Sequence, residues 1–141
     1  MAAFNKHQDY VEQLCKGIHI WSSHTFKLLL TNSAPLATNT IKSDLTEISA
    51  GNGYSAGGMT CDSVTLTESS GTAKVTIADE VLTASGGAIA TFRYVDLYND
   101  SATSPADALV GWWDYGSSIA PADGESFTVD FDGSGGVWTL V

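Results

Sequence analysis

Histidines are the first residues in this chain that could do chemistry. His7, His19 and His24 are its only three histidines, and they stand twelve and then five residues apart. No Asp or Glu stands at a spacing that would complete a metal-binding triad with them on a helix or strand. We therefore expect the histidines to be packing or surface residues, and we predict no metal site.

A serine nucleophile is suggested by the letters Gly-x-Ser-x-Gly around Ser55. That motif works as a sharp turn from a strand into a helix, and the histidine of its triad follows the serine along the chain. Here a glycine-rich loop precedes Ser55, a β-hairpin pattern follows it, and no histidine comes later. We predict no hydrolase site.

Pairs of carboxylates provide no complete calcium site and no acid-base pair. Asp130-x-Asp132-Gly133-Ser134 resembles a fragment of a calcium loop but lacks the further ligands and the distal Glu. Asp79 and Glu80 are adjacent, so on a strand their side chains point to opposite faces and cannot act as an acid-base pair. The sequence thus favours a protein that is not an enzyme and that uses no cofactor.

Aromatic residues form the most distinctive cluster, in GWWDYG at positions 111–116. Neighbouring side chains on a strand face opposite ways, so Trp112 and Trp113 should enter different environments. Either both are buried, or one anchors the core while the other contacts a partner or stacks on a sugar. Trp and Tyr are the residues that protein interfaces favour at their centres.

The first 20 residues have the pattern of an amphipathic helix. Phe4, Val11, Leu14, Cys15 and Ile18 recur at steps of three and four, which is typical of one apolar face of a helix. Asn5 is the expected N-cap, and Trp21-Ser22-Ser23 is the expected exit. Such a helix must cover its apolar face against the rest of the chain or against a neighbouring subunit.

From Thr25 onward the pattern is that of short strands separated by turns. We expect strands over 25–32, 61–68, 73–78, 81–84, 90–99, 108–115, 126–131 and 137–141, with an irregular loop over 33–58. Residues 100–105 and 116–118 read as a loop and a turn, and Gly111 indicates a bulge or close packing. The expected architecture is one domain, 1–141, with a helix and its exit over 1–22 and a β-rich body over 25–141. The fold class is mainly β, an antiparallel β-sandwich or jelly-roll-like domain with one N-terminal amphipathic α-helix.

The composition of the chain limits the kinds of partner and the cellular location that we expect. The 141 residues carry 16 acidic and 6 basic side chains, a formal charge of −10. Such a surface repels phosphate, so we expect no nucleic-acid partner. No apolar run approaches the roughly 20 residues that span a bilayer, and the N-terminus lacks a signal-peptide pattern. We therefore expect no membrane association and no secretion.

Cys15 and Cys61 are expected to be small buried residues.

Five segments together resemble a family of small virion structural proteins of tailed bacteriophages. They are FKLLLTNSAP (26–35), DLTEI (44–48), GNGYSAGG (51–58), FRYVDLYND (92–100) and LVGWWDYG (109–116). The resemblance covers nearly the whole chain. Its motifs are structural, so it supplies no catalytic or ligand residues.

The resemblance implies a component of the phage particle, assembled in the host cytoplasm. Within that class we expect a head decoration, or cement, protein on the capsid surface. Its partners would be the major capsid protein and copies of itself in a homotrimer. The alternatives are a minor tail or fibre-associated protein, and a carbohydrate-binding β-sandwich that stacks sugars on Trp112, Trp113 or Tyr115. The candidate contact residues are Phe4, Val11, Leu14, Ile18, Tyr54, Trp112, Trp113 and Tyr115.

Overall fold

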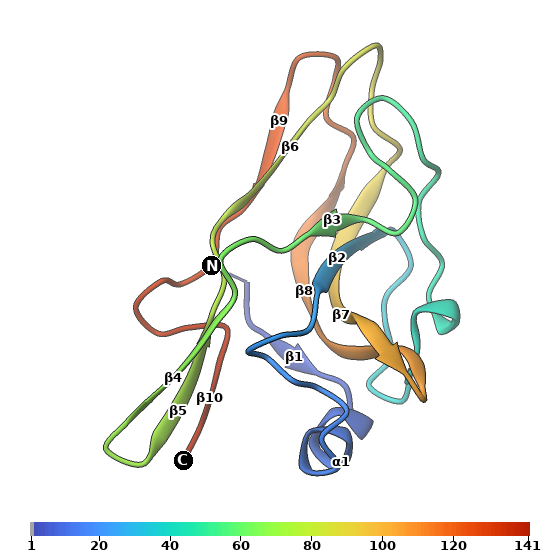
Figure 1. The fold of residues 1–141 in the computed structure, drawn as a ribbon. Helices are drawn as coiled ribbons and strands as arrows, with labels where there is room; N and C mark the ends of the chain where they lie inside the picture. The colour runs from blue at the N-terminus through green and yellow to red at the C-terminus, as the bar shows by residue number, and fades with distance from the viewer. Residues whose placement is uncertain (1) are drawn as a thin grey trace.

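Alternating polar and apolar residues place a large part of the chain, though less than half of it, in strands. The structure is a computed structural model that describes residues 2–141. Two β layers pack against each other, with one short helix beside them (Figure 1). This confirms the predicted mainly-β, antiparallel fold with one N-terminal helix.

The larger layer is an antiparallel sheet of five strands in the order β1-β8-β7-β2-β3. In that order the strands are Asn5–Lys6, Ala106–Ile119, Phe92–Thr103, Phe26–Thr31 and Met59–Thr60. The central strand β2 is buried at every residue except the half-buried Lys27, and the central strand β7 is buried over residues 95–99. In β2 the three leucines at 28–30 form the continuous apolar run that a strand covered on both faces requires.

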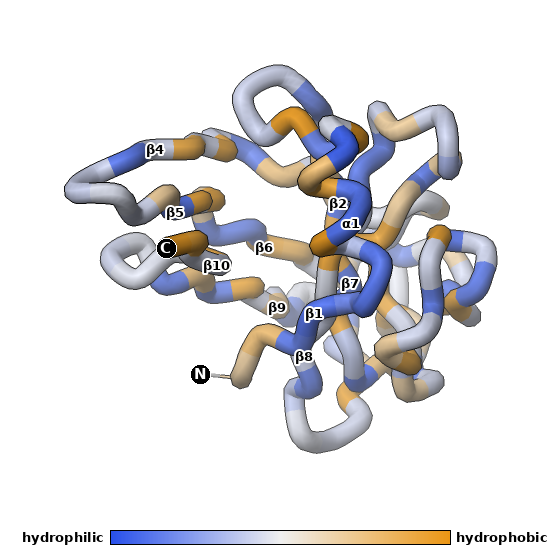
Figure 2. Tube along the Cα trace, turned by 90° about the horizontal axis from the view of Figure 1, so that it is seen from below, coloured by the Kyte–Doolittle hydropathy of each residue, from blue (hydrophilic) through white to orange (hydrophobic). Residues whose placement is uncertain are grey.

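The second layer is a longer, thinner ribbon. Its lower part is the three-stranded sheet β10-β5-β4, and its upper part is the pair β6-β9. The strands are β4 (Thr65–Ser69), β5 (Thr72–Thr76), β6 (Glu80–Thr83), β9 (Ser126–Val129) and β10 (Trp138–Leu140). Because β6 follows β5 and β10 follows β9, the two parts continue each other. Figure 2 shows this ribbon lying beside the five-stranded sheet.

The core lies between the two layers. Trp21 stacks flat on Phe26, with ring centroids 3.8 Å apart and an interplanar angle of 4°. Trp138 of the ribbon meets Trp21 edge-on at 5.8 Å. One cluster of buried apolar residues extends from Tyr10 to Val137. The N-terminal segment and the β-rich body therefore share a single core.

The opposite face of the five-stranded sheet is covered by residues 33–58, which include the short 3-10 helix η1 (Lys42–Asp44). Leu29, Tyr98 and Leu109 form a second buried cluster there, against Leu45. Four glycines of this loop have positive φ, as its composition predicted. At Gly58 a Cβ would collide with the Leu28 carbonyl, so the loop can approach β2 closely only because this residue is glycine.

The N-terminal helix is shorter than its spacing predicted, and its buried face is different. Helix α1 covers only Asp9–Cys15, with Gln8 at the N-cap. Asn5, the predicted cap, lies in β1 and pairs with Trp112 instead. The buried side chains of α1 are Tyr10 and Gln13, and both bind partners: the Tyr10 hydroxyl accepts from Trp21, and Gln13 bonds His19. Helix α1 therefore buries the side chains that hydrogen-bond to buried partners, and not the face that the apolar spacing predicted.

Three further predictions differ from the structure. Residues 100–105 are a tight hairpin in which β7 runs on to Thr103 and β8 begins at Ala106, and residues 116–118 lie within β8. Cys15 is exposed, whereas Cys61 is buried as expected. None of the helices in residues 2–141 is long and apolar enough to cross a membrane.

Candidate functional site

Strand β8 separates its two tryptophans, as the sequence predicted. Trp112 packs on the His7 ring, with centroids 4.6 Å apart. Trp113 instead contacts the rings of Phe4, at 5.2 Å, and Phe131, at 5.5 Å. Both tryptophans are half-buried. Trp112 contacts a cluster that is polar and buried, and Trp113 belongs to a cluster that is apolar and open to solvent.

The polar cluster centres on a His–Asp pair with no exposed surface. His7 Nε2 lies 2.9 Å from Asp96 Oδ2, and His7 Nδ1 lies 3.2 Å from the Leu36 carbonyl oxygen. Both side chains are 0% exposed. Both ring nitrogens face oxygen atoms. Each of the two contacts is therefore a hydrogen bond only if a proton lies between the nitrogen and the oxygen. Burial raises the pKa of Asp96 to about 6, and the hydrogen bond from His7 opposes that rise.

A second buried network holds the exit of α1. His19 Nε2 lies 2.9 Å from Gln13 Oε1, and its Nδ1 lies 3.2 Å from Asn99 Nδ2. Gln13 can accept and Asn99 can donate, so the neutral ring satisfies both contacts. Burial, with a smaller contribution from His24, lowers the pKa of His19 to about 4. Asn99 also donates to the Ile18 carbonyl.

These networks act as structural ties, because no substrate could reach them. His7 and Asp96 attach the N-terminal segment and the loop at Leu36 to β7, and His19 attaches α1 to β7. This agrees with the expectation that the histidines are packing residues. Among residues 2–141 no group of three or more His, Cys, Asp or Glu side chains is placed to hold a metal ion.

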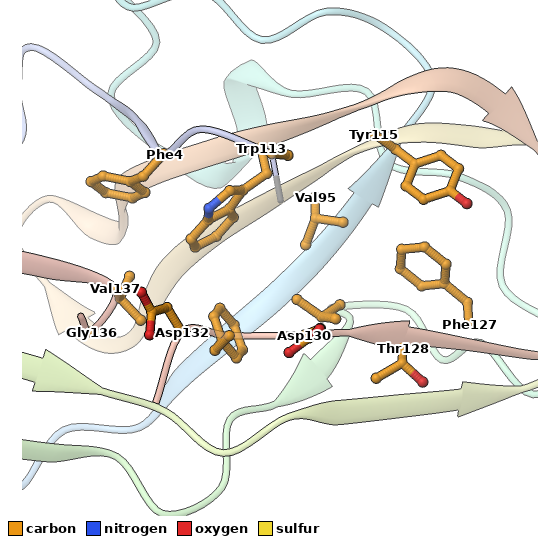
Figure 3. Close-up of a pocket in the computed structure, with 13 residues that line it drawn as sticks. Phe4, Val95, Trp113, Tyr115, Phe127, Thr128, Asp130, Asp132, Gly136 and Val137 are labelled. Atoms are coloured by element: carbon orange, nitrogen blue, oxygen red, sulfur yellow. The ribbon is translucent and has the colours of Figure 1, made fainter. Parts of the chain in front are cut away.

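The apolar cluster is an open groove between the two layers, and it is the candidate functional site (Figure 3). One wall carries Phe4, Trp113 and Tyr115, and the other carries Phe127, Phe131 and Val137. The groove has a volume of about 550 Å³, within the roughly 300–1,000 Å³ typical of ligand sites. The Tyr115 side chain is 54% exposed and lies edge-on to Phe127 at 5.6 Å.

Free strand edges border the groove on both sides. On one side β8 pairs with β7, with register shifts that leave residues 115–118 without partners in β7, whereas on the other side β1 pairs with β8 only at Gly111 and Trp112. Beyond Trp112, no strand of the described chain pairs with residues 113–119 on that side. Likewise, β9 pairs only with β6. Unpaired edges present backbone donors and acceptors that can bind another strand.

The rim of the groove is acidic. Asp130 and Asp132 line it, and no lysine or arginine does so among the residues that the structure describes. Backbone N–H groups of Gly135 and Ser134 lower the pKa of Asp132, so this carboxylate is charged at neutral pH. Lys74 lies beside this loop, and its Nζ donates to the Ser134 carbonyl.

The structure brings together only some of the predicted contact residues. Phe4, Trp113 and Tyr115 share the groove, whereas Trp112 lies with His7 away from it. Val11 is exposed, and Leu14 and Ile18 are half-buried. Tyr54 is 2% exposed: its hydroxyl accepts from the Leu30 N–H and donates to Glu47, so it has no surface to offer a partner.

Sequence reasoning missed Phe127, Phe131 and the two rim aspartates as parts of one site. Phe127 and Phe131 were placed on an alternating strand, but nothing in the sequence shows that this strand faces Trp113 across a gap. Comparison of the chain with protein-family models, with curated proteins and with solved structures found no match.

Proposed function

We propose that this chain is a structural protein of a tailed-bacteriophage virion, most specifically a head decoration protein. In this role it binds the lattice of the major capsid protein and stabilises the head. The observation that carries the proposal is the groove with two free strand edges, because it is a surface suited to assembly. The buried histidine networks offer no access for a substrate.

The sequence resemblance supports the virion setting. Its segments map to β2, β7, β8 and the loop over 33–58. These elements are the three long strands of the five-stranded sheet and the loop that covers it, so the resemblance concerns the part of the fold that holds the groove in place.

Charge supports the choice of partners. A formal charge of −10 favours basic protein surfaces and opposes nucleic acid and anionic membranes. We propose the major capsid protein as the main partner, with copies of this chain in a homotrimer, on the capsid surface. Assembly in the host cytoplasm follows from this role.

A minor tail or fibre-associated protein is the second candidate, because the same groove and edges would serve a contact in the tail. Copy number separates the two roles. A decoration protein is present in hundreds of copies per particle, and a tail protein in a handful.

A carbohydrate-binding role would use Trp113 and Tyr115, since Trp112 lies elsewhere. Sugar stacking needs accessible ring faces, preferably in a flat row. In the groove, neighbouring rings meet at steep angles: 71° between Trp113 and Phe131, and 78° between Tyr115 and Phe127. This arrangement favours a channel for a protein segment over a stacking platform.

Quantitative mass spectrometry of purified virions tests the proposal, together with sedimentation of the purified protein with empty capsids. We expect hundreds of copies per particle and saturable binding to capsids. A protein that is absent from virions and does not sediment with capsids would contradict the proposal.

A further inference from the structure

The chain already adds one short strand to the edge that borders the groove. Asn5 and Lys6 pair with Trp112 and Gly111 of β8, and the preceding Phe4 places its ring against Trp113 at the end of the groove. At Gly111 a Cβ would collide with the Phe4 ring and the Asn5 carbonyl. Glycine is therefore what lets this strand approach. The free edge of β8 continues from this point through Asp114 and Tyr115, and the backbone leaves extended geometry at Gly116, whose φ is +97°.

The side chains beside that free edge have the spacing of a strand. Trp113 and Tyr115 are two residues apart on β8, so they project to the same face about 7 Å apart. Alternate side chains of an incoming strand would have the same spacing. They could enter the groove between these rings and Phe127 while their backbone pairs with β8.

The charges at the rim select the kind of segment. Asp130 is exposed, and Asp132 is held as a carboxylate by backbone N–H groups. A second copy of this chain, with a formal charge of −10, would bring like charge to the groove. A segment with Lys or Arg at the positions facing the rim would be attracted.

We propose that the groove between β8 and β9 binds an extended segment of a partner protein, which adds to the free edge of β8 as a strand. The side chains of the segment that point into the groove are apolar beside the aromatic rings and are Lys or Arg beside Asp130 and Asp132. Only the identity of the partner, another virion protein, rests on the proposed function.

Selection from a library of random short peptides tests this inference without a virion. The purified protein is the bait, and the Tyr115→Ala variant is the counter-bait, because Tyr115 forms a groove wall while remaining largely exposed. We expect the enriched peptides to carry apolar residues and at least one Lys or Arg at positions two residues apart, and to lack Pro in their centre. No enrichment over the variant, or enrichment of acidic or Pro-rich peptides, would overturn the inference.

Affinities of one enriched peptide for matched variants sharpen the test. We expect Tyr115→Ala and Asp130→Lys each to weaken binding about tenfold or more, which is about 1.4 kcal/mol. Leu36→Ala and Asp9→Lys change an exposed apolar residue and an exposed carboxylate outside the groove, and should alter affinity less than about twofold. Equal losses in the control variants would contradict a site in the groove.

Amide chemical shifts of the labelled protein locate the peptide. We expect the largest changes in residues 113–119 of β8 and in β9. Two results would replace the proposed occupant. One is a stronger response of the same amides to maltohexaose or chitohexaose, which would indicate a sugar site. The other is self-association that buries Trp113, which would indicate a second copy.

The final comparison separates this inference from the proposed function. If the peptide binds as expected but Tyr115→Ala and Asp130→Lys proteins still load onto capsids normally, the groove binds a strand but is not the capsid contact. If the enriched peptides match no segment of any virion protein, the strand site stands and the virion partner is wrong.

Discussion

Gly111 shows at the scale of one residue how the groove is built. Its missing side chain gives room to the Phe4 ring and the Asn5 carbonyl, so β1 can lie against β8. Close packing at this glycine was expected from its place in a strand pattern. The partner that packs there could not be expected, because Phe4 was assigned to a helix.

Gly111→Ala should lower the free energy of unfolding by about 1–3 kcal/mol, since the added methyl group overpacks this contact. Gly133 is the matched control: a Cβ there meets nothing within 4 Å, and its φ is not positive. Urea denaturation measures both variants. A Gly111→Ala protein as stable as Gly133→Ala would show that β1 does not pack on β8 as described.

His19 gives the fold a dependence on pH. Its pKa falls from 6.5 to about 4 on folding, so the unfolded chain takes up the proton first on acidification. The stability from neutral His19 is complete above pH 6.5 and is lost as pH falls toward 4, by about 3 kcal/mol. Asp96, raised to about 6 from 3.8, acts in the opposite direction: its contribution to stability falls as pH rises from 4 to 6.

We therefore expect the two effects to offset each other largely in the natural protein between pH 4 and 6. His19→Gln removes one of them while an amide can still bond Gln13 and Asn99. Its free energy of unfolding, measured by urea denaturation at several pH values, should fall as pH rises across this range. A variant whose pH dependence matches that of the natural protein would contradict the role of His19.

At the scale of elements, alternation predicted β5, β6 and β9 well, and a run of apolar residues predicted β2. Strands β2, β5, β6 and β9 lie within about two residues of their expected bounds. The helix failed because spacing alone does not show which face is buried. Tyr10 and Gln13 are buried through hydrogen bonds from Trp21 and with His19, which lie outside the helix.

The orientation of α1 can be tested through the two cysteines. Cys15 is exposed on α1, whereas Cys61 is buried and burial raises the pKa of its thiol. We expect a maleimide reagent to modify one thiol per native chain, and the second only after denaturation. Mass spectrometry after digestion identifies the site.

The Cys15→Ser variant is the control for that experiment, and it should remain unmodified until it unfolds. Protection of Cys15 in the native protein would instead indicate that α1 buries the face that its apolar spacing predicted.

At the scale of the whole molecule, the groove exists because two layers leave their edges open on the same side. Its walls come from β8 and from residues 127–137, which meet only through the arrangement of the layers. The sequence identified Phe4, Trp113 and Tyr115 as candidates for contact. It could not place the opposing wall, because no periodicity along the chain encodes the distance between layers.

The same arrangement supports the proposal that the molecule acts in assembly. Aromatic rings fill its core, and His7 and His19 make hydrogen bonds within the molecule. Free strand edges, apolar rings and negative charge are all found at the groove. A partner that supplies a strand with basic side chains would satisfy all three.

A cryo-EM map of the virion is the most direct test of the central claim, that this chain is an assembly protein of the phage head. We expect density for the chain repeated over the capsid lattice, with residues 113–119 of β8 facing another protein. Density confined to the tail would contradict the head decoration role. Complete absence of the chain from the particle would contradict the claim itself.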